Sequence, residues 1–436
     1  MQAAAPTFNK DVAPILYANC VSCHRPGGSG PFSLIEYENA ELAAEAIKAA
    51  VSSRQMPPWF ADPQHGDFKN ERRLTDAQLA TIARWVDAGA PRGDGSAPEA
   101  PALPDNGGWD ARMNRPPDLV LDLPFGEFPL PMAGEVPTFT VWTKLPLRED
   151  RFVQAIQIKP SLAHAVHHSS LALASLPPGT RLGRGAVFDG GPVLDGVPVF
   201  DDGRPFRAAS GDEFGRPIFF YVPGGGFMQL ADGLGKRFRR DDYLAWGLHL
   251  IADPHPGGKL SAQVGIWYNR RDPHHEVHTW TVNQGLSFNG QDVPLTAQGG
   301  RVMPAIPPGA ANLPVVGTLR FEDAVTLYAL WPHMHYRGKD MTFTLREPNG
   351  KETVLLSVPN YNPHWQLTYE LEKPLKIRRG SVITAAGHYD NSAANPHNPD
   401  PAATVRFGPQ GTDEMYIPFI EVSVDRDDLR FERLFR

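Results

Sequence analysis

The sequence has little cysteine and no long apolar run. Its two cysteines among 436 residues, Cys20 and Cys23, are too close together to staple a domain, so a disulfide scaffold is excluded. No stretch approaches the roughly eighteen apolar residues of a membrane helix. The net charge is −7 and no basic run occurs, so neither nucleic acid nor an anionic membrane is an expected partner. The length predicts two or three domains held together by packing alone.

Helical patterns are confined to the first ninety residues. Apolar spacing predicts one helix from about Phe8 to Cys20, a second over 39–54, and a third after a capping box at Thr75. Proline (44) and glycine (41) are abundant, and apolar residues alternate after Asp118. These features are typical of an all-β body with short strands.

We therefore expect a multidomain chain with a small all-α domain followed by two all-β sandwiches. The expected ranges are 1–94 for the helical domain, 95–117 for a linker, and 118–282 and 283–436 for the sandwiches. The linker range is rich in proline, glycine, alanine and aspartate and has no periodicity, as is typical of a flexible coil.

The segment Cys20-Val21-Ser22-Cys23-His24 matches Cys-x-x-Cys-His. In this motif two thiols add to the haem vinyl groups and the histidine becomes an axial iron ligand. A zinc knuckle would need two more ligands nearby, and a thioredoxin-like pair would need a βαβ context. Neither is present, so the motif predicts one covalent haem c at Cys20, Cys23 and His24.

The sixth haem ligand is expected to be Met56, which lies in a loop stiffened by Pro57 and Pro58. A thioether suits haem iron and raises its potential. His65 is the alternative. Residues 7–94 as a whole resemble a class I cytochrome c, which implies an electron carrier outside the cytoplasm. The opening residues Met1–Pro6 look like the remainder of a removed secretion signal, so we expect a periplasmic or otherwise exported protein.

Fifteen histidines indicate nitrogen-ligated metal, and three clusters are candidates. His333 and His335 are two apart, so in a strand both project from one face and can reach a single ion if a third ligand is found. His167 and His168 follow His164. Adjacent residues face opposite ways in a regular strand, so this pair can share a metal only at a bulge or a strand end.

Two other groups of histidines have weaker patterns. His249 lies in an apolar strand and taken alone is typical of a satisfied core histidine. The cluster of His274, His275 and His278 does not have the Glu-x-x-His order of a zinc protease, and we interpret it as surface, with metal binding as the alternative.

From about Asp118 onward these landmarks resemble the copper type II, ascorbate-dependent monooxygenases, the family of peptidylglycine α-hydroxylating monooxygenase and dopamine β-monooxygenase. The resemblance implies two jelly-roll domains with one copper each. It implies that His167, His168 and His249 hold the electron-transfer copper. It further implies that His333, His335 and Met415, in Thr412-Asp413-Glu414-Met415, hold the oxygen-binding copper, as suits a soft thioether that favours Cu(I).

The sequence departs from the family pattern at three positions. Trp331 replaces an arginine that helps to hold the substrate carboxylate, Phe419 replaces a tyrosine, and Gly247 replaces a glutamine. The disulfides of the animal enzymes are also absent. A peptide C-terminus is therefore not the expected substrate, and Trp331 with Phe419 favours an apolar or aromatic one.

These interpretations together predict an exported haem- and copper-dependent monooxygenase that uses O2. Its electrons would come through the fused cytochrome from an ascorbate-like reductant or another cytochrome, and tethering by the linker would remove the need for tight docking. Two alternatives remain: an oxidoreductase that passes substrate electrons out through the cytochrome, and a non-enzymatic electron-transfer or copper-binding protein.

Overall fold

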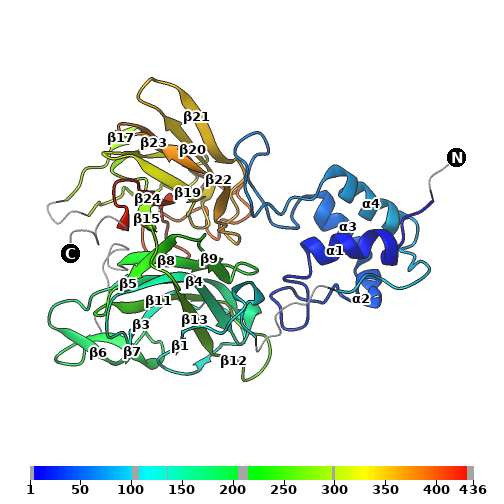
Figure 1. Cartoon of the computed structure of the whole chain (residues 1–436), viewed down its shortest axis with the longest axis horizontal. Helices are drawn as coiled ribbons and strands as arrows, with labels where there is room; N and C mark the ends of the chain where they lie inside the picture. The colour runs from blue at the N-terminus through cyan, green and yellow to red at the C-terminus, as the bar shows by residue number, and fades with distance from the viewer. Residues whose placement is uncertain (1–3, 101–107, 135, 205–214, 297–299, 430–436) are drawn as a thin grey trace.

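The computed structural model describes residues 4–100, 108–134, 136–204, 215–296 and 300–429. Over these residues the chain is mostly β-sheet with four α-helices, as expected for β-sandwich domains. Figure 1 shows the helical region to one side of two β-regions that lie against each other. None of the described helices is long and apolar enough to cross a membrane.

The helical region packs around a small core of its own that includes Phe8, Leu16 and Trp85. Its elements are the π-helix Phe8–Val12 and the α-helices α1 (Ala13–Asn19), α2 (Tyr37–Leu42), α3 (Ala44–Ser52) and α4 (Asp76–Asp87). The predicted capping box is confirmed, because Thr75 accepts from the Gln78 N–H while the Gln78 side chain bonds the Thr75 backbone. The single helix predicted over 39–54 is divided in two at Ala43.

The first sandwich contains a six-stranded sheet with the order β1-β13-β4-β10-β14, in which β9 also pairs with β4, and a four-stranded sheet with the order β3-β11-β5-β8. Its strands are β1 (Leu119–Asp122), β2 (Phe128–Pro129), β3 (Phe139–Lys144), β4 (Arg151–Pro160), β5 (Val166–Ala174), β6 (Thr180–Ala186), β7 (Val193–Phe200), β8 (Arg216–Tyr221), β9 (Phe227–Gln229), β10 (Leu234–Phe238), β11 (Tyr243–Leu250), β12 (Lys259–Leu260), β13 (Ala262–Tyr268) and β14 (His275–Glu276). Residues 108–117, within the predicted linker, lie against this sandwich, since Trp109 and Met113 pack with Trp267.

The second sandwich pairs a four-stranded sheet, β15-β24-β19-β22, with a six-stranded sheet, β17-β16-β18-β23-β20-β21. Its strands are β15 (His278–Thr281), β16 (Gly285–Phe288), β17 (Gln291–Asp292), β18 (Leu313–Arg320), β19 (Val325–Trp331), β20 (Gly338–Arg346), β21 (Glu352–Val358), β22 (Tyr369–Ile377), β23 (Val382–Tyr389) and β24 (Phe419–Val424). Since β14 pairs with the first sandwich and β15 with the second, the chain crosses between them at Val277.

A segment of the helical region, residues 59–72, lies along the edge strand β22 of the second sandwich (Figure 1). The Lys69 N–H donates to the Glu370 carbonyl at 3.0 Å, and the Asn70 amide donates to the Thr368 carbonyl at 2.8 Å. The Trp59 ring packs edge-on against Tyr369 with centroids 4.9 Å apart. The helical region is thus fixed to the second sandwich by its own backbone and not held by the linker alone.

Candidate metal centre

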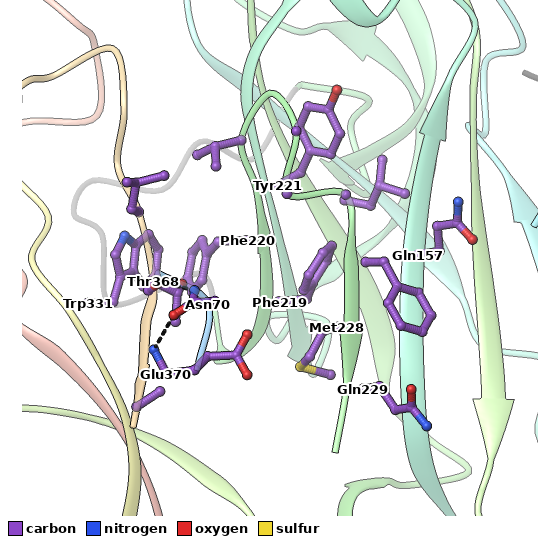
Figure 2. Close-up of a pocket in the computed structure, with 18 of the residues that line it drawn as sticks. Asn70, Gln157, Phe219, Phe220, Tyr221, Met228, Gln229, Trp331, Thr368 and Glu370 are labelled. Atoms are coloured by element: carbon purple, nitrogen blue, oxygen red, sulfur yellow. Dashed lines mark hydrogen bonds between the residues drawn. The ribbon is translucent and has the colours of Figure 1, made fainter. Parts of the chain in front are cut away.

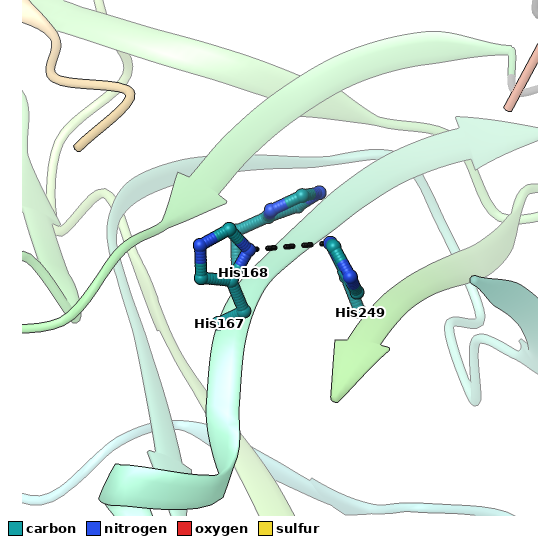
Figure 3. A group of neighbouring side chains, drawn as sticks. All are labelled: His167, His168 and His249. Atoms are coloured by element: carbon teal, nitrogen blue, oxygen red, sulfur yellow. Dashed lines mark hydrogen bonds between the residues drawn. The ribbon is translucent and has the colours of Figure 1, made fainter. Parts of the chain in front are cut away.

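His167, His168 and His249 converge at one end of the first sandwich, where β5 begins and β11 ends (Figure 3). His168 pairs directly with His249, and the register shifts at the next residue, so that His167 occupies a bulge. This irregularity is what allows two adjacent histidines to face one point. Their ligand nitrogens all lie within 4.8 Å of one another, and Nδ1 of His167 is 3.3 Å from Nδ1 of His249.

The chemistry of this cluster suits a metal ion. Burial is the main cause that lowers the pKa of His167 to about 3 and of His249 to about 4, so both imidazoles are neutral, as ligands must be. The Nδ1 atom of His168 is buried and has no hydrogen-bond partner. Nitrogens about 2 Å from one ion at a near-tetrahedral angle lie about 3.3 Å apart, which matches the distance between the Nδ1 atoms of His167 and His249.

His333 and His335 follow β19 in the second sandwich, and both are buried. Nδ1 of His333 lies 2.7 Å from the Gln366 Oε1, and Nδ1 of His335 lies 3.2 Å from the Asp413 carbonyl. Each Nδ1–H therefore donates to an oxygen, which leaves each Nε2 lone pair available to a metal. Burial lowers the pKa of His333 to about 4 and of His335 to about 3.

Met415 lies opposite this pair of histidines. Met334 forms an antiparallel bridge with Tyr416, which places Met415 opposite His335 on the same face of the bridge. The buried Glu414 carboxyl accepts from the backbone N–H groups of His335, Arg337 and Met415. Burial raises the Glu414 pKa to about 8. Glu414 thus holds the His-x-His segment and Met415 together.

The first histidine group and His335 of the second line one cavity between the sandwiches. A space of about 10 Å³ is lined by His167, His168 and His249 from the first sandwich and by His335 and Gln366 from the second. The interface beside it is fixed by paired backbone-to-amide bonds between Thr138 and Gln410. The two predicted metal sites are therefore neighbours.

Two residues that the sequence did not single out contact the histidines. Gln366 binds His333, and Nδ1 of His364 lies 3.1 Å from Nε2 of His167. Both belong to the connection between β21 and β22. No spacing rule relates this connection to either cluster. Of the two residues, only His364 is of a type that commonly binds metals, and it was not among the predicted candidates.

The Cys-x-x-Cys-His segment follows α1, and both cysteines are unpaired. Nδ1 of His24 lies 3.2 Å from the Phe32 carbonyl, so its N–H donates there and the Nε2 lone pair is available to a metal. Gly30 permits this arrangement, because a Cβ there would lie 2.8 Å from the His24 ring. Met56 is half-buried after α3. His65 lies on the segment bound to β22.

The same motif touches the first sandwich at Gly224, in the turn after β8. A Cβ at Gly224 would lie 2.4 Å from the Cys23 Sγ, and Arg72 donates to the Gly224 carbonyl at 3.0 Å. Three residues earlier, Tyr221 pairs across the sheet with Ser169, which follows His168. A short run of packed backbone thus joins Cys23 to the His167, His168 and His249 cluster.

A second, larger cavity of about 670 Å³ lies where the helical region meets both sandwiches (Figure 2). Three aromatic rings, Phe220, Trp331 and Phe419, line one end, and the Trp331 and Phe419 rings stack with centroids 4.5 Å apart. The Trp331 ring is 5.7 Å from the His333 ring. Gln366 lines both this cavity and the small one, and so lies between them.

The remaining histidine candidates lie elsewhere. His164 is exposed and 3.7 Å from Asp253. His275 and His278 occupy β14 and β15 at the crossing between the sandwiches. Among the described residues, the only group of three or more potential ligands of the His, Cys, Asp and Glu types is that of His167, His168 and His249.

Comparison with known proteins supports the resemblance of the second sandwich to a copper monooxygenase domain. Residues 305–422 match the family model of the copper type II ascorbate-dependent monooxygenase, C-terminal domain. The match covers about a quarter of the chain and contains His333, His335 and Met415. The second sandwich is thus similar to a copper monooxygenase domain. No curated protein matches the chain.

Solved structures show only remote likeness. A Paenibacillus xanthan lyase is 9% identical with a TM-score of 0.17, and the match covers 76% of this chain and 28% of the lyase. An allantoicase is 10% identical with a TM-score of 0.17, covering 58% and 75% of the two chains. The CBM22-1-CBM22-2 tandem domain from Paenibacillus barcinonensis Xyn10C is 8% identical with a TM-score of 0.18, covering 71% and 98%.

Proposed function

We propose that this protein is an exported haem- and copper-dependent monooxygenase that hydroxylates a small apolar or aromatic substrate with O2. The observation that carries the proposal is the pair of neutral histidine clusters around one small cavity, the second of them within the matched copper monooxygenase domain. A protein that only binds or transports copper does not require a large aromatic cavity beside His333, so the presence of this cavity favours an enzyme.

Each proposed copper site has its own ligand set. His167, His168 and His249 would hold one ion, and His333, His335 and Met415 would hold the other. Copper at these positions would supply one-electron redox chemistry and oxygen binding. The protein contributes neutral imidazoles, the Gln366 and Asp413 oxygens that orient two of them, and a thioether that favours Cu(I).

The large cavity is the proposed substrate site. Its volume of about 670 Å³ is within the range of small-molecule pockets, and Phe220, Trp331 and Phe419 offer flat apolar surface at the end nearest His333. The charged side chains on its wall are partly compensated, as Lys69 pairs with Glu370 and Arg112 with Asp110. These contacts favour a neutral aromatic or apolar substrate.

The proposed reaction is R–H + O2 + 2 e⁻ + 2 H⁺ → R–OH + H2O. Both electrons come from an external reductant, either ascorbate-like or a cytochrome. Haem c bound at Cys20, Cys23 and His24, with Met56 as sixth ligand, would pass them one at a time. The contact of Cys23 with Gly224, followed by the Tyr221–Ser169 pairing next to His168, supports entry at the first histidine cluster.

The proposal is tested by reducing the protein anaerobically, admitting O2 and following haem reoxidation. We expect fast reoxidation with copper, slow reoxidation without it, and slow reoxidation in Met415→Ala. The matched control is Met132→Ala, which removes an exposed thioether from the first sandwich. Reoxidation that is indifferent to copper and to Met415 would refute the proposed pathway. It would favour the alternative in which the cytochrome exports substrate electrons.

A further inference from the structure

We infer that His364 is a positioning residue for the metal site of the first sandwich, which it reaches from the second. The inference rests on the proposed function, because it assumes copper at His167, His168 and His249. His364 is outside both expected ligand sets. It joins a histidine of one sandwich to a loop of the other.

The two ring nitrogens of His167 face different partners. Nδ1 is 3.3 Å from Nδ1 of His249, inside the cluster, whereas Nε2 is 3.1 Å from Nδ1 of His364. A single ion binds one nitrogen of an imidazole. With Nδ1 turned to the cluster, Nε2 carries the proton and donates it to His364. A hydrogen bond of this kind fixes the tautomer and ring orientation of a ligand and raises its basicity.

His364 is not a fourth ligand in this arrangement. It approaches His167 from the ring nitrogen opposite to the one that faces His249, so the His167 ring lies between His364 and the cluster. His364 is also exposed to solvent, whereas His249 is buried.

The loop that carries His364 is built to hold it in place. The Asn362 side chain accepts the His364 N–H at 3.0 Å, and the Trp365 N–H donates to the Asn362 carbonyl. Gln366 accepts from His333 while its own amide donates to the Pro363 carbonyl at 3.2 Å. One braced loop therefore contacts a histidine of each metal site, through His364 on one side and Gln366 on the other.

This arrangement makes the affinity of the first site depend on the second sandwich. If the sandwiches separated, His167 would lose its partner and the ring would be free to turn. Copper at the first site is thus expected to bind more tightly when the interface is closed.

The test measures copper affinity in a His335→Ala background, so that the first site is studied alone. Copper(II) is titrated in competition with a chelating dye, and the bound ion is followed by electron paramagnetic resonance. We expect His364→Ala to weaken copper binding by about 10- to 100-fold and to change the hyperfine pattern. His364→Asn, whose Oδ1 can replace the acceptor, should recover most of the affinity.

The control is His255→Ala, which removes a largely exposed histidine of the first sandwich paired with Asp253 and should leave binding unchanged. Equal affinity in the parent and in His364→Ala would overturn the inference alone. Equal weakness of the Ala and Asn variants would also overturn it, since the acceptor would then be irrelevant. A parent that binds no copper would overturn the proposed function as well.

Discussion

Gln366 is the residue that determines how His333 is presented. Its Oε1 accepts from His333 at 2.7 Å, and both side chains are buried, so no water can take over this bond without rearrangement. The same side chain separates the large cavity from the small one. A substitution of Gln366 is therefore expected to change metal binding more than it changes the stability of the fold.

Gln366→Leu should weaken copper binding at the second site by about 10- to 100-fold, because His333 loses its orienting acceptor. Gln366→Glu keeps an oxygen for His333 but puts an acceptor oxygen opposite the Pro363 carbonyl, so it should bind copper less well than the parent and better than Gln366→Leu. Competition titration of both variants measures the difference. Equal affinities in the two variants would show that the bond to His333 is unimportant.

The buried histidines also predict how the metal-free protein responds to acid. His167, His249, His333 and His335 have pKa values of about 3 to 4 in the fold, against an ordinary value of 6.5. At pH values between these folded-state pKa values and 6.5, the unfolded chain therefore binds more protons than the folded protein. Each group costs at most about 1.4 kcal/mol of stability per pH unit as the pH falls through this window.

We expect the urea midpoint of the metal-free protein to fall from pH 6.5 toward pH 4, because the four histidines together outweigh Glu414, whose pKa of about 8 in the fold acts in the opposite direction. His333→Gln, which cannot take up a proton, should show a shallower fall than the parent. Denaturation followed by tryptophan fluorescence measures both. A midpoint that stays level between pH 7 and pH 5 would contradict the burial of these imidazoles.

At the scale of secondary-structure elements, the turn after β8 requires a glycine. Gly224 has φ +76° and almost touches the Cys23 sulfur, so a side chain there meets both backbone strain and a collision. Gly203, with φ +84°, has the same strain but nothing within 4 Å of its Cβ position.

On the proposed pathway, Gly224→Ala should therefore slow electron transfer from reduced haem to copper by about tenfold or more, because the collision pushes the modules apart. Gly203→Ala should lose about 1 kcal/mol of stability from backbone strain alone and leave the rate unchanged. Flash reduction of the haem with absorbance detection measures the rate. Equal rates in both variants would place electron entry elsewhere.

Sequence patterns predicted the local elements well and the long-range contacts poorly. The Thr75 capping box and the His-x-His pair depend on neighbouring residues, so their spacing carried the information. His167 and His168 converge because of a bulge. From the sequence, a bulge could be stated only as a condition for these two residues to share a metal. His364 reaches His167 only through the packing of one sandwich on the other, and Gln366 reaches His333 from a separate connection of the second sandwich, so no local pattern encodes either contact.

At the scale of the whole molecule, the three regions share cores and contacts. Trp59 and Phe68 belong to the helical part of the sequence but pack within the core of the second sandwich. Between the sandwiches, the buried Lys236 ammonium pairs with Glu421 at 2.8 Å and donates to Thr279. These contacts join the three regions into one assembly. The helical region is connected to the sandwiches both by the linker and by the packing of residues 59–72.

A protease site inserted after Glu99 tests this unity. After cleavage the two fragments should stay together in size-exclusion chromatography, because the bonds of Lys69 and Asn70 to β22 and the packing of Trp59 remain. The double variant Trp59→Ala, Phe68→Ala removes most of this packing and should release the helical fragment. Separation of the fragments with both aromatic residues present would show that the linker alone holds them.

The segment that lies along β22 also bears on how the chain is made. Asn70 bonds to Thr368, 298 positions later, so during synthesis this segment emerges long before its partner strand. Closing so long a loop is entropically costly and comes late in folding. Until then Trp59 and Phe68 lack their native cover, and once β22 forms, its edge is open to other chains until the segment pairs with it. The nascent protein is thus most prone to aggregation after β22 has formed and before residues 59–72 pair with its edge.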